Sequence, residues 1–419
     1  MSRWIVKRIF FYLLVLILSI GIAYDLLSTW RGVSLLKPPY PSEKIFLKAF
    51  RFAPSNPDPS YGLSLFYQWD FRSMDLKKSL SYIHQAIERN PLEQTYWINL
   101  AKMQQRLGEK KAFERALEHA IFVNPTGYQG RWVAGNLFLQ GEDVPKALPH
   151  FSYLLRYYPE QSSLVYDVWS KVVDDPDFIL EKLVPEDTLS LRSYLSYLYE
   201  NNDGESAKKV WQKRASLGQK VDRSETLRHI DFLISRNEFR EAMEVWKARL
   251  QEEGISIPTD GNLITDGSFE KEKILGGGFD WKIADVKGAK VAFDRSVAFE
   301  GNRSIKITFD GKENVDFHHV HQIVSLKPNT DYSLKACIRT KEVTTKSGPK
   351  IEVYEIGSTF YGSSESVVGD NAWKELSVTF RTTPQSQAGV VRVRREKTDK
   401  FDRLISGTVW IDNVRLTEH

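Results

Sequence analysis

Three histidines stand close together in the sequence, at His318, His319 and His321. Imidazole nitrogens are common zinc ligands. The stretch alternates like a β-strand, in which His319 and His321 would share one face and His318 would point to the other. No second ligand motif accompanies them, and catalytic zinc sites recruit their ligands from separate elements. We therefore interpret the cluster as ordinary strand histidines and not as a metal centre.

A second group of polar residues is basic and comprises Arg392, Arg394, Arg395, Lys397 and Lys400. Alternation along a strand places Arg392 and Arg394 on the same face. Such a face could meet an anionic glycan or a phospholipid surface. A solvated strand face is the interpretation that we favour.

Motifs of common enzyme classes are absent from the sequence. It contains no Gly-x-Ser-x-Gly, no phosphate-binding glycine-rich loop and no His-Glu-x-x-His. A carboxylate pair for glycoside hydrolysis depends on separation in space, which the sequence does not give. We predict that the protein is not an enzyme.

Composition bounds the class of protein. A chain of 419 residues exceeds a single core and predicts two or three domains. A net charge of +4 is close to neutral at this size and argues against a nucleic-acid partner. The single cysteine, Cys337, excludes an intrachain disulfide, and its strand-like neighbours predict a buried, unreactive thiol.

The N-terminal segment, residues 1–27, is basic and then apolar. Residues 1–8 contain basic but no acidic residues, and residues 9–24 are almost continuously apolar. This order predicts export with the N-terminus in the cytoplasm. It fits a signal anchor, which we favour, or a cleavable signal peptide with its small-x-small site at 21–23. Both place the remaining chain outside the cytoplasm, after a proline-rich extended spacer at 28–42.

Prolines then recur at a fixed interval of 34 residues, at Pro57, Pro91, Pro125 and Pro159. Ahead of each lies a triplet of apolar or small residues spaced four and three apart, which predicts one face of an α-helix that ends before the proline. After the prolines, Ala101 and Gly135 occupy positions where helices could approach closely. A related pair of segments, 207–214 and 242–249, predicts two further, less regular units, and residues 160–193 interrupt the pattern. This interruption fits a bend or a specialised partner site, and Asp187 and Thr188 are the expected helix caps after it.

This pattern resembles the tetratricopeptide repeat over residues 43–254. The resemblance implies an all-α helical solenoid whose groove binds a partner protein.

Helical spacing ends at a linker, 255–261, and short alternating segments with Gly, Pro and Asn turns follow. They predict an all-β antiparallel β-sandwich of about eight strands over residues 262–419. The clearest strand candidates are 304–309, 321–326, 332–338, 351–354, 374–380, 390–394 and 409–416.

Four strings in this region resemble the jelly-roll, galactose-binding-like carbohydrate-binding modules attached to bacterial polysaccharide hydrolases. They are residues 262–270, 301–307, 324–332 and 411–414. The resemblance implies a sandwich that binds glycan. Sugar rings stack their C–H faces on aromatic side chains, while amides and charged groups read the hydroxyls. The candidates for such contacts are Tyr354, Phe360, Tyr361, Trp281 and Trp373, with His318 and Gln322 as polar neighbours. For Trp281 and Trp373 we favour burial in the sandwich.

The same family often carries a structural calcium ion that joins the first strand to the last. The matching carboxylates are Glu270 and Asp412. The alternative is that both only cap turns. No other cofactor is expected.

Together these features predict a single-pass protein of a bacterial inner membrane with its bulk in the periplasm. The expected function is a scaffold for assembly or export of a cell-surface polysaccharide, with the repeat groove holding a protein and the sandwich touching the glycan. The alternatives are an interaction factor that binds only proteins and, less favoured, a glycan-modifying enzyme.

Overall fold

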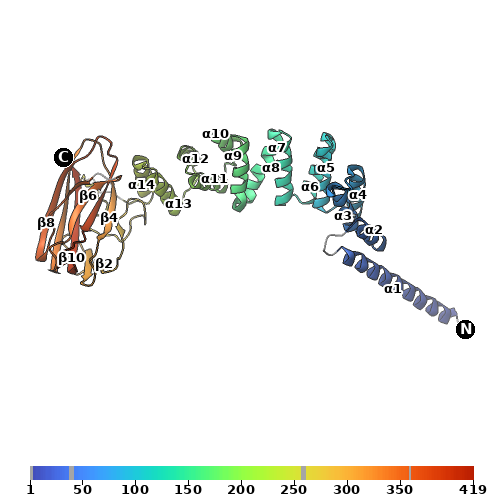
Figure 1. The fold of residues 1–419 in the computed structure, drawn as a ribbon, viewed down its shortest axis with the longest axis horizontal. Coiled ribbons are helices and arrows are strands. Elements are labelled where there is room, and N and C mark those ends of the chain that lie inside the picture. Colours follow the sequence, from blue (N-terminus) through green and yellow to red (C-terminus); the bar gives the residue numbers. More distant parts are fainter. Residues whose placement is uncertain (1–2, 37–41, 256–260, 358–359) are drawn as a thin grey trace. The chain divides into compact units, whose positions relative to one another are not determined.

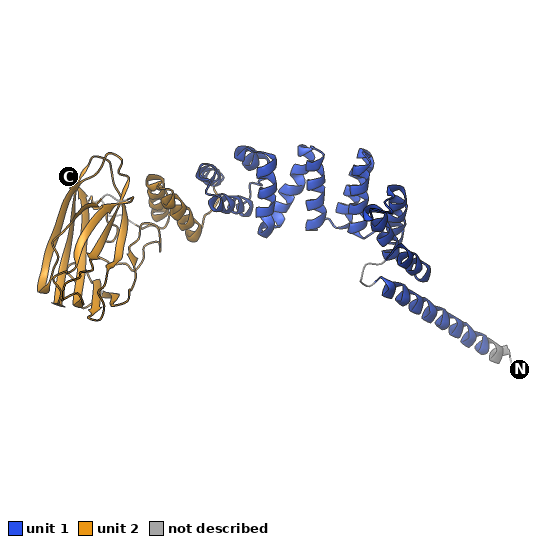
Figure 2. Ribbon diagram, in the orientation of Figure 1, with its two compact units in different colours: residues 1–217 blue, residues 218–419 orange. Residues whose placement is uncertain are grey.

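The computed structural model describes residues 3–36, 42–255, 261–357 and 360–419. The chain divides into two compact units, residues 1–217 and residues 218–419 (Figure 2). Helices form the first unit, while the second begins with two helices and continues into two β-sheets (Figure 1).

The first unit contains α1 (Arg3–Leu35), α2 (Glu43–Phe52), α3 (Asp58–Trp69), α4 (Leu76–Arg89), α5 (Gln94–Arg106), α6 (Lys110–Val123), α7 (Tyr128–Gln140), α8 (Val144–Tyr157), η1 (Pro159–Gln161), α9 (Ser162–Val172), α10 (Pro176–Phe178), the π-helix η2 (Ile179–Leu183), α11 (Thr188–Glu200) and α12 (Gly204–Ser216). The second unit opens with α13 (Arg223–Ser235) and α14 (Phe239–Glu252).

Helix α1 extends beyond the apolar segment of residues 9–24 that the sequence analysis describes. Within the described residues, it is the one helix long and apolar enough, over Arg8–Leu35, to cross a membrane. Residues 28–35, expected to be extended, are helical because they pack on α2. The Ser28 hydroxyl donates to the carbonyl of Phe52, and Gly32 lies against Ala49 and Ala53. The rest of the expected spacer, residues 37–41, lies outside the described residues.

The proline interval predicted the ends of three helices correctly. Helices α4, α6 and α8 end at Arg89, Val123 and Tyr157, each two residues before a proline. The predicted triplets of these helices are buried, as a core-facing stripe requires. Helix α2 ends earlier, at Phe52, and of its triplet only Ala49 is buried. The likeness to the tetratricopeptide repeat stays an interpretation.

The small residues after the prolines do allow close packing. Ala101 is fully buried. A Cβ atom at Gly135 would lie 2.6 Å from the ring of Phe151, so a larger residue would push α7 away from α8. The interruption at 160–193 contains α10 and η2. Within it, Asp187 caps α11 by accepting from the backbone N–H of Ser190 at 2.9 Å. Thr188 is the first residue of that helix and not its cap.

Among the described residues, two antiparallel sheets of five strands each form the predicted sandwich, which has ten strands where about eight were expected. Sheet A has the order β1-β4-β9-β6-β7 and sheet B the order β2-β3-β10-β5-β8. The strands are β1 (Lys282–Ile283), β2 (Ala289–Asp294), β3 (Ser304–Asp310), β4 (Phe317–Ser325), β5 (Asp331–Val343), β6 (Lys350–Glu355), β7 (Phe360–Ser363), β8 (Gly369–Arg381), β9 (Ala388–Arg395) and β10 (Ser406–Glu418). Figure 1 shows β4 and β6 on one side of the sandwich and β8 and β10 on the other.

The division between the two compact units lies at residue 217, before the linker that the sequence predicts, and the predicted domain bounds stay a prediction. That linker is 255–261, of which residues 256–260 lie outside the described part. The structure groups α13 and α14 with the sandwich, and the second unit starts at Gly218. A hydrophobic cluster shared by these helices and the loop before β1 accounts for the difference.

Candidate functional site

In sheet A, residues paired between neighbouring strands form a row of polar side chains that crosses its five described strands. Lys282 pairs with His321, and His321 pairs with Arg392. Arg392 pairs in turn with Glu352, and Glu352 with Ser363. Residues paired across strands share a face, and their neighbours along β4, β6 and β9 fill the buried core. The polar row, Lys282-His321-Arg392-Glu352-Ser363, therefore lies on the outer face of sheet A.

A second row on the same face is apolar and aromatic. Ile323 pairs with Val390, Val390 with Tyr354, and Tyr354 with Phe360. Phe360 is 58% exposed, and Tyr354 is half-buried. This apolar row, Ile323-Val390-Tyr354-Phe360, runs beside the polar row and gives the face one apolar and one polar side.

Arg392 joins the two rows. Its guanidinium carbon lies 4.4 Å from the centroid of the Tyr354 ring. Its Nε and Nη2 atoms donate to one oxygen of Glu352, at 3.1 and 2.5 Å. Glu352 is itself 4% exposed. A charged donor held beside an aromatic ring is already ordered before a ligand arrives, which lowers the entropy lost on binding.

Of the residues predicted to contact sugar, Tyr354 and Phe360 lie on this face, but Tyr361 does not. Tyr361 packs against the core, where its ring stacks on Phe380 at 5.1 Å and its hydroxyl bonds to Ser386 at 3.1 Å. The register between β6 and β7 shifts between Val353 and Tyr354, so that Phe360 pairs with Tyr354 while Tyr361 stays unpaired in the ladder and packs inward.

Gln322 is also inside and not on the binding face. It is 1% exposed, its Nε2 donates to the carbonyl of Thr265 at 2.9 Å, and its Oε1 accepts from the N–H of Thr265 at 2.8 Å. Both ends of the amide are thereby used to fix the first segment of the sandwich. They are not available to read hydroxyl groups.

Neither of the two candidate tryptophans, Trp281 and Trp373, lies in the apolar row. Trp281 packs against the core as favoured: its ring lies 4.9 Å from that of Phe269, and its indole N–H donates to the carbonyl of Asp266 at 3.1 Å. Trp373 lies on β8 in sheet B, half-buried, with its ring 5.8 Å from that of Phe299. It therefore lies neither on sheet A nor fully in the core.

The histidine cluster departs from strict alternation. A register irregularity between Phe317 and Val320 brings the rings of His318 and His319 together at 4.4 Å, so they do not point to opposite faces. His318 stays exposed at this end of β4. His321 belongs to the polar row, where burial, with Lys282 and Arg392 nearby, lowers its pKa. In the part of the chain that the structure describes, no group of three or more His, Cys, Asp or Glu residues could hold a metal ion.

Glu270 and Asp412 hold the two ends of one short loop before β3. Asp412, fully buried, accepts from the N–H groups of Phe299 at 2.7 Å and Glu300 at 3.1 Å. Glu270 accepts from the N–H groups of Asn302 at 2.8 Å and Arg303 at 3.2 Å. Burial raises the pKa of Asp412. Burial would also raise the pKa of Glu270, but the N–H donors outweigh it and hold that pKa below its usual range.

These contacts bear on the calcium expectation. Oε1 of Glu270 and Oδ2 of Asp412 each accept two N–H bonds, which occupies both lone pairs of each oxygen. Calcium takes six to eight oxygen ligands, and the described residues offer no acidic cluster around this pair. The donor set thus does not fit a cation without rearrangement. Calcium stays a prediction, to be tested by chelation.

The basic stretch divides between the face and the core. Arg392 and Arg394 share one face as predicted, and both approach Glu352. Arg395 is fully buried, and its guanidinium donates to the carbonyls of Val315 at 2.5 Å and Arg403 at 2.8 Å, which corrects the expectation of a solvated face. Cys337 is 5% exposed, and burial raises its pKa to about 11, as expected of an unreactive thiol.

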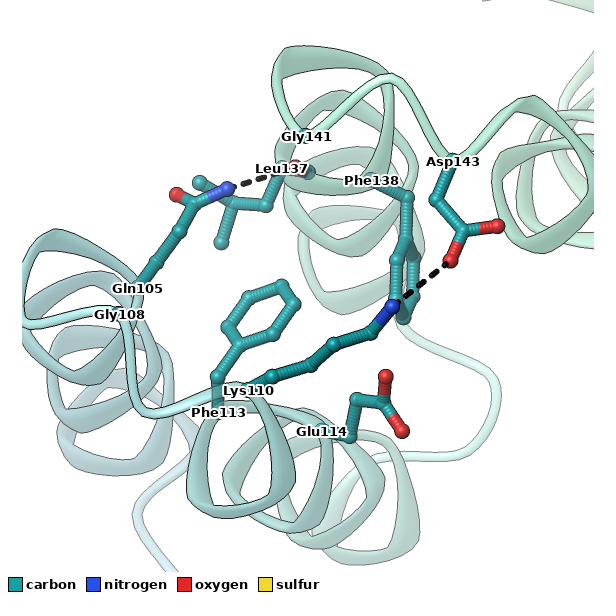
Figure 3. A pocket seen from close by; sticks show the side chains of 9 residues that line it. All are labelled: Gln105, Gly108, Lys110, Phe113, Glu114, Leu137, Phe138, Gly141 and Asp143. Carbon is teal, nitrogen blue, oxygen red and sulfur yellow. Dashed lines mark hydrogen bonds and ion pairs between the residues drawn. The ribbon is translucent and has the colours of Figure 1, made fainter.

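The helical unit contains a small cavity of about 150 Å³ at the ends of α5 and α7 (Figure 3). Phe113, Leu137 and Phe138 supply its apolar lining. At its rim, Nζ of Lys110 lies 3.9 Å from a carboxylate oxygen of Asp143. Its volume is about that of one side chain.

Comparison with known proteins gives a family match in the region of the sandwich. The family described as "Carbohydrate binding domain" matches residues 261–400. A curated relative, the tRNA(Glu)-specific nuclease WapA of Bacillus subtilis subsp. natto (strain BEST195), is 26% identical over 166 residues. That alignment covers 37% of this chain and 7% of the relative, so the chain spans only a small part of that protein.

Two solved structures are similar to the sandwich. One, described as "Family 16 Carbohydrate Binding Module-2", is 24% identical, with a TM-score of 0.27 over 38% of this chain and 100% of that chain. The other, "CBM4 structure and function", is 14% identical, with a TM-score of 0.29 over 37% of this chain and 99% of that chain. By its match to the family model over residues 261–400, the C-terminal β-sandwich of this protein is similar to a carbohydrate binding domain.

Proposed function

We propose that the outer face of sheet A binds a glycan. The observation that carries this proposal is the register of the two rows, which sets Tyr354 and Phe360 beside Arg392 and Glu352. A sugar ring needs an apolar surface for its C–H face and polar groups for its hydroxyls, and these rows supply both. The match of residues 261–400 to a carbohydrate binding domain supports the same assignment.

The wider role that we propose is that of an anchored scaffold in a bacterial envelope. Helix α1 would hold the chain in the inner membrane, and the helical unit would bind a partner protein outside the cytoplasm. The glycan would then be a cell-surface polysaccharide during its assembly or export. The length and apolar composition of α1 support the anchor. The paired helices of the first unit support a partner-binding role.

The direct test uses the full chain in a mild detergent on an array of bacterial and plant polysaccharides that includes xylan, β-glucan and alginate. We expect binding that Tyr354→Ala and Phe360→Ala each weaken about tenfold, the scale of one aromatic stacking contact. Trp373→Ala is the matched control, because Trp373 is also a partly exposed aromatic residue but lies on sheet B. It should bind like the wild type.

Absence of binding to every glycan by the folded chain would refute glycan recognition. It would favour the alternative, an envelope factor that binds only proteins. Equal weakening by Trp373→Ala would place the site on the other sheet. Turnover of a bound polysaccharide would support the glycan-modifying enzyme.

A further inference from the structure

The outer face of sheet A continues beyond the polar row into a third row, which is basic. Lys350 on β6 pairs with Arg394 on β9. Arg394 lies two residues after Arg392 on the same face, so this basic row runs beside the polar row, on the side away from the apolar row. The face therefore changes from apolar through polar to basic, and cations stand in two of its three rows.

Within the described strands, this face carries one carboxylate, and it is buried beneath two arginines. Glu352 is 4% exposed. Nε and Nη2 of Arg392 donate to its Oε1 at 3.1 and 2.5 Å, and Nε of Arg394 lies 3.9 Å from its Oε2. A carboxylate that is already paired and covered presents little negative charge to a ligand. At the centre of the face, a ligand instead meets the guanidinium of Arg392.

The other acidic partners of the face come from outside the strands. Asp316, which precedes β4, accepts from Nη1 of Arg394. An oxygen of Glu396, which follows β9, lies 3.0 Å from Nζ of Lys350. Three cations of the face are thus matched by three carboxylates, of which one is buried and two lie at the strand ends.

Lys282 is the remaining cation, and it is the first residue of the polar row. It is exposed, and it forms no ion pair with any residue that the structure describes. The strand pairing places it two strands away from Arg392, about 10 Å at the backbone. His321 stands between them, and its lowered pKa leaves it uncharged near neutral pH. The polar row therefore has an excess positive charge.

Arg392 retains one nitrogen for a ligand. Its Nη1 donates to none of the described residues, and its side chain is 21% exposed. The contact with Glu352 and the ring of Tyr354, 4.4 Å away, hold the guanidinium in place. A fixed guanidinium favours a carboxylate over a hydroxyl group, because the carboxylate adds charge attraction to the hydrogen bond.

We propose that the glycan bound on sheet A is an acidic polysaccharide, whose carboxylates contact Lys282 and Arg392 while its sugar rings lie on the apolar row. An anionic lipid surface would offer the same charge. Insertion into lipid needs protruding apolar side chains, however, and only Phe360 of the apolar row is exposed. This proposal rests on the proposed function and names the class of glycan.

The test compares the binding of the full chain to polygalacturonate and to its methyl ester, because the ester keeps the sugars and removes the charge. We expect the acid form to bind at least about tenfold more tightly. Raising the salt concentration from about 0.05 M to about 0.5 M should weaken that binding about tenfold, through screening. Alginate should behave like the acid form and β-glucan like the ester. Polyglutamate, a polyanion without sugar rings, should bind poorly.

Substitutions at Lys282 test the charge on the face. Lys282→Gln should weaken binding to polygalacturonate about fivefold, the scale of one exposed charge pair. Lys282→Arg keeps the charge and should bind like the wild type. Lys290→Gln is the matched control, because Lys290 is an exposed strand lysine of sheet B, and it should also bind like the wild type. The thermal midpoints of these variants should equal that of the wild type, because both lysines are exposed.

The outcomes separate this proposal from the one on which it rests. If the ester binds as tightly as the acid form and Tyr354→Ala weakens both, the acidic class is wrong and the glycan face stands. If the folded chain binds neither acidic nor neutral polysaccharides, both proposals fail.

Three further results would overturn the acidic class. Equal weakening by Lys282→Gln and Lys290→Gln, or tight binding of polyglutamate, would show that the net charge of the chain attracts the polymer. Loss of binding in Lys282→Arg would show that the shape of the side chain matters and not its charge. Binding to vesicles that contain anionic lipid, without binding to polysaccharide, would assign the face to a membrane.

Discussion

Single carboxylates fix the loop before β3, and their surroundings predict the effect of metal removal. Asp412 is buried and accepts three backbone N–H bonds, from Phe299, Glu300 and Asn413. These donors satisfy the carboxylate without a cation. We expect that a chelator leaves the thermal midpoint of the wild type unchanged. Asp412→Asn should lower the free energy of unfolding by about 2 kcal/mol, because the side-chain amide puts an NH₂ donor where a carboxylate oxygen accepted hydrogen bonds.

Calorimetry of the full chain with EDTA and with added Ca²⁺ makes this measurement. Glu375→Gln, at an exposed position on β8, is the control and should be neutral. A midpoint that Ca²⁺ raises in the wild type but not in Asp412→Asn would contradict the expectation. It would establish the calcium site that the family resemblance implies.

Also at the residue scale, the sequence offers aromatic candidates but does not give the direction in which each side chain points. Alternation is visible in residues 390–394, and it correctly placed Arg392 and Arg394 together. It does not tell which face of a strand is buried, so Phe360 and Tyr361 stayed equivalent until the sheet register separated them. Gln322 was misplaced for a related reason. A buried amide is stable only with partners, and its partner, Thr265, is distant in sequence.

Close helix packing, at the scale of elements, yields a prediction for the first unit. Helices α7 and α8 meet where Gly135 faces Phe151. Gly135→Val should destabilise this unit by about 1–3 kcal/mol, the usual cost of overpacking. Gly141→Ala is the control, because its φ is −89° and its new Cβ would meet the nearest atoms at an ordinary 3.6 Å. Urea unfolding followed by circular dichroism at a helical wavelength measures both; equal stability of the two variants would show that α7 and α8 do not pack closely here.

Helix ends were predictable from sequence, whereas the grouping of helices into units was not. A proline ends a helix because it has no backbone N–H to donate, and this effect depends only on the local sequence. The assignment of α13 and α14 depends instead on Gly278 admitting Trp246, a contact between residues far apart in the chain. The same glycine-rich segment has the composition of an ordinary turn. Local patterns therefore place a linker at residues 255–261 but do not reveal the hydrophobic cluster that α13 and α14 share with the loop before β1.

The division of the whole molecule at residue 217 predicts how it unfolds. Two units with separate cores should melt in separate steps. Trp169 and Trp246 are a matched pair of buried indoles, 0% and 1% exposed, in the first and second unit respectively. Removing either should cost about 3–5 kcal/mol. Trp246→Ala should lower only the transition that contains the sandwich, and Trp169→Ala only the other.

Differential scanning calorimetry gives the two midpoints, and far-ultraviolet circular dichroism tells which one carries the loss of β-structure. If the sandwich transition of Trp246→Ala has the same midpoint as that of the wild type, the hairpin of α13 and α14 folds independently of the sandwich. A drop of the sandwich transition would instead show that a helical hairpin completes the β-domain. In that case the stability of the proposed glycan face on sheet A depends on α13 and α14. A partner that bends this hairpin would then change the affinity of that face for a glycan, because the two equilibria are linked.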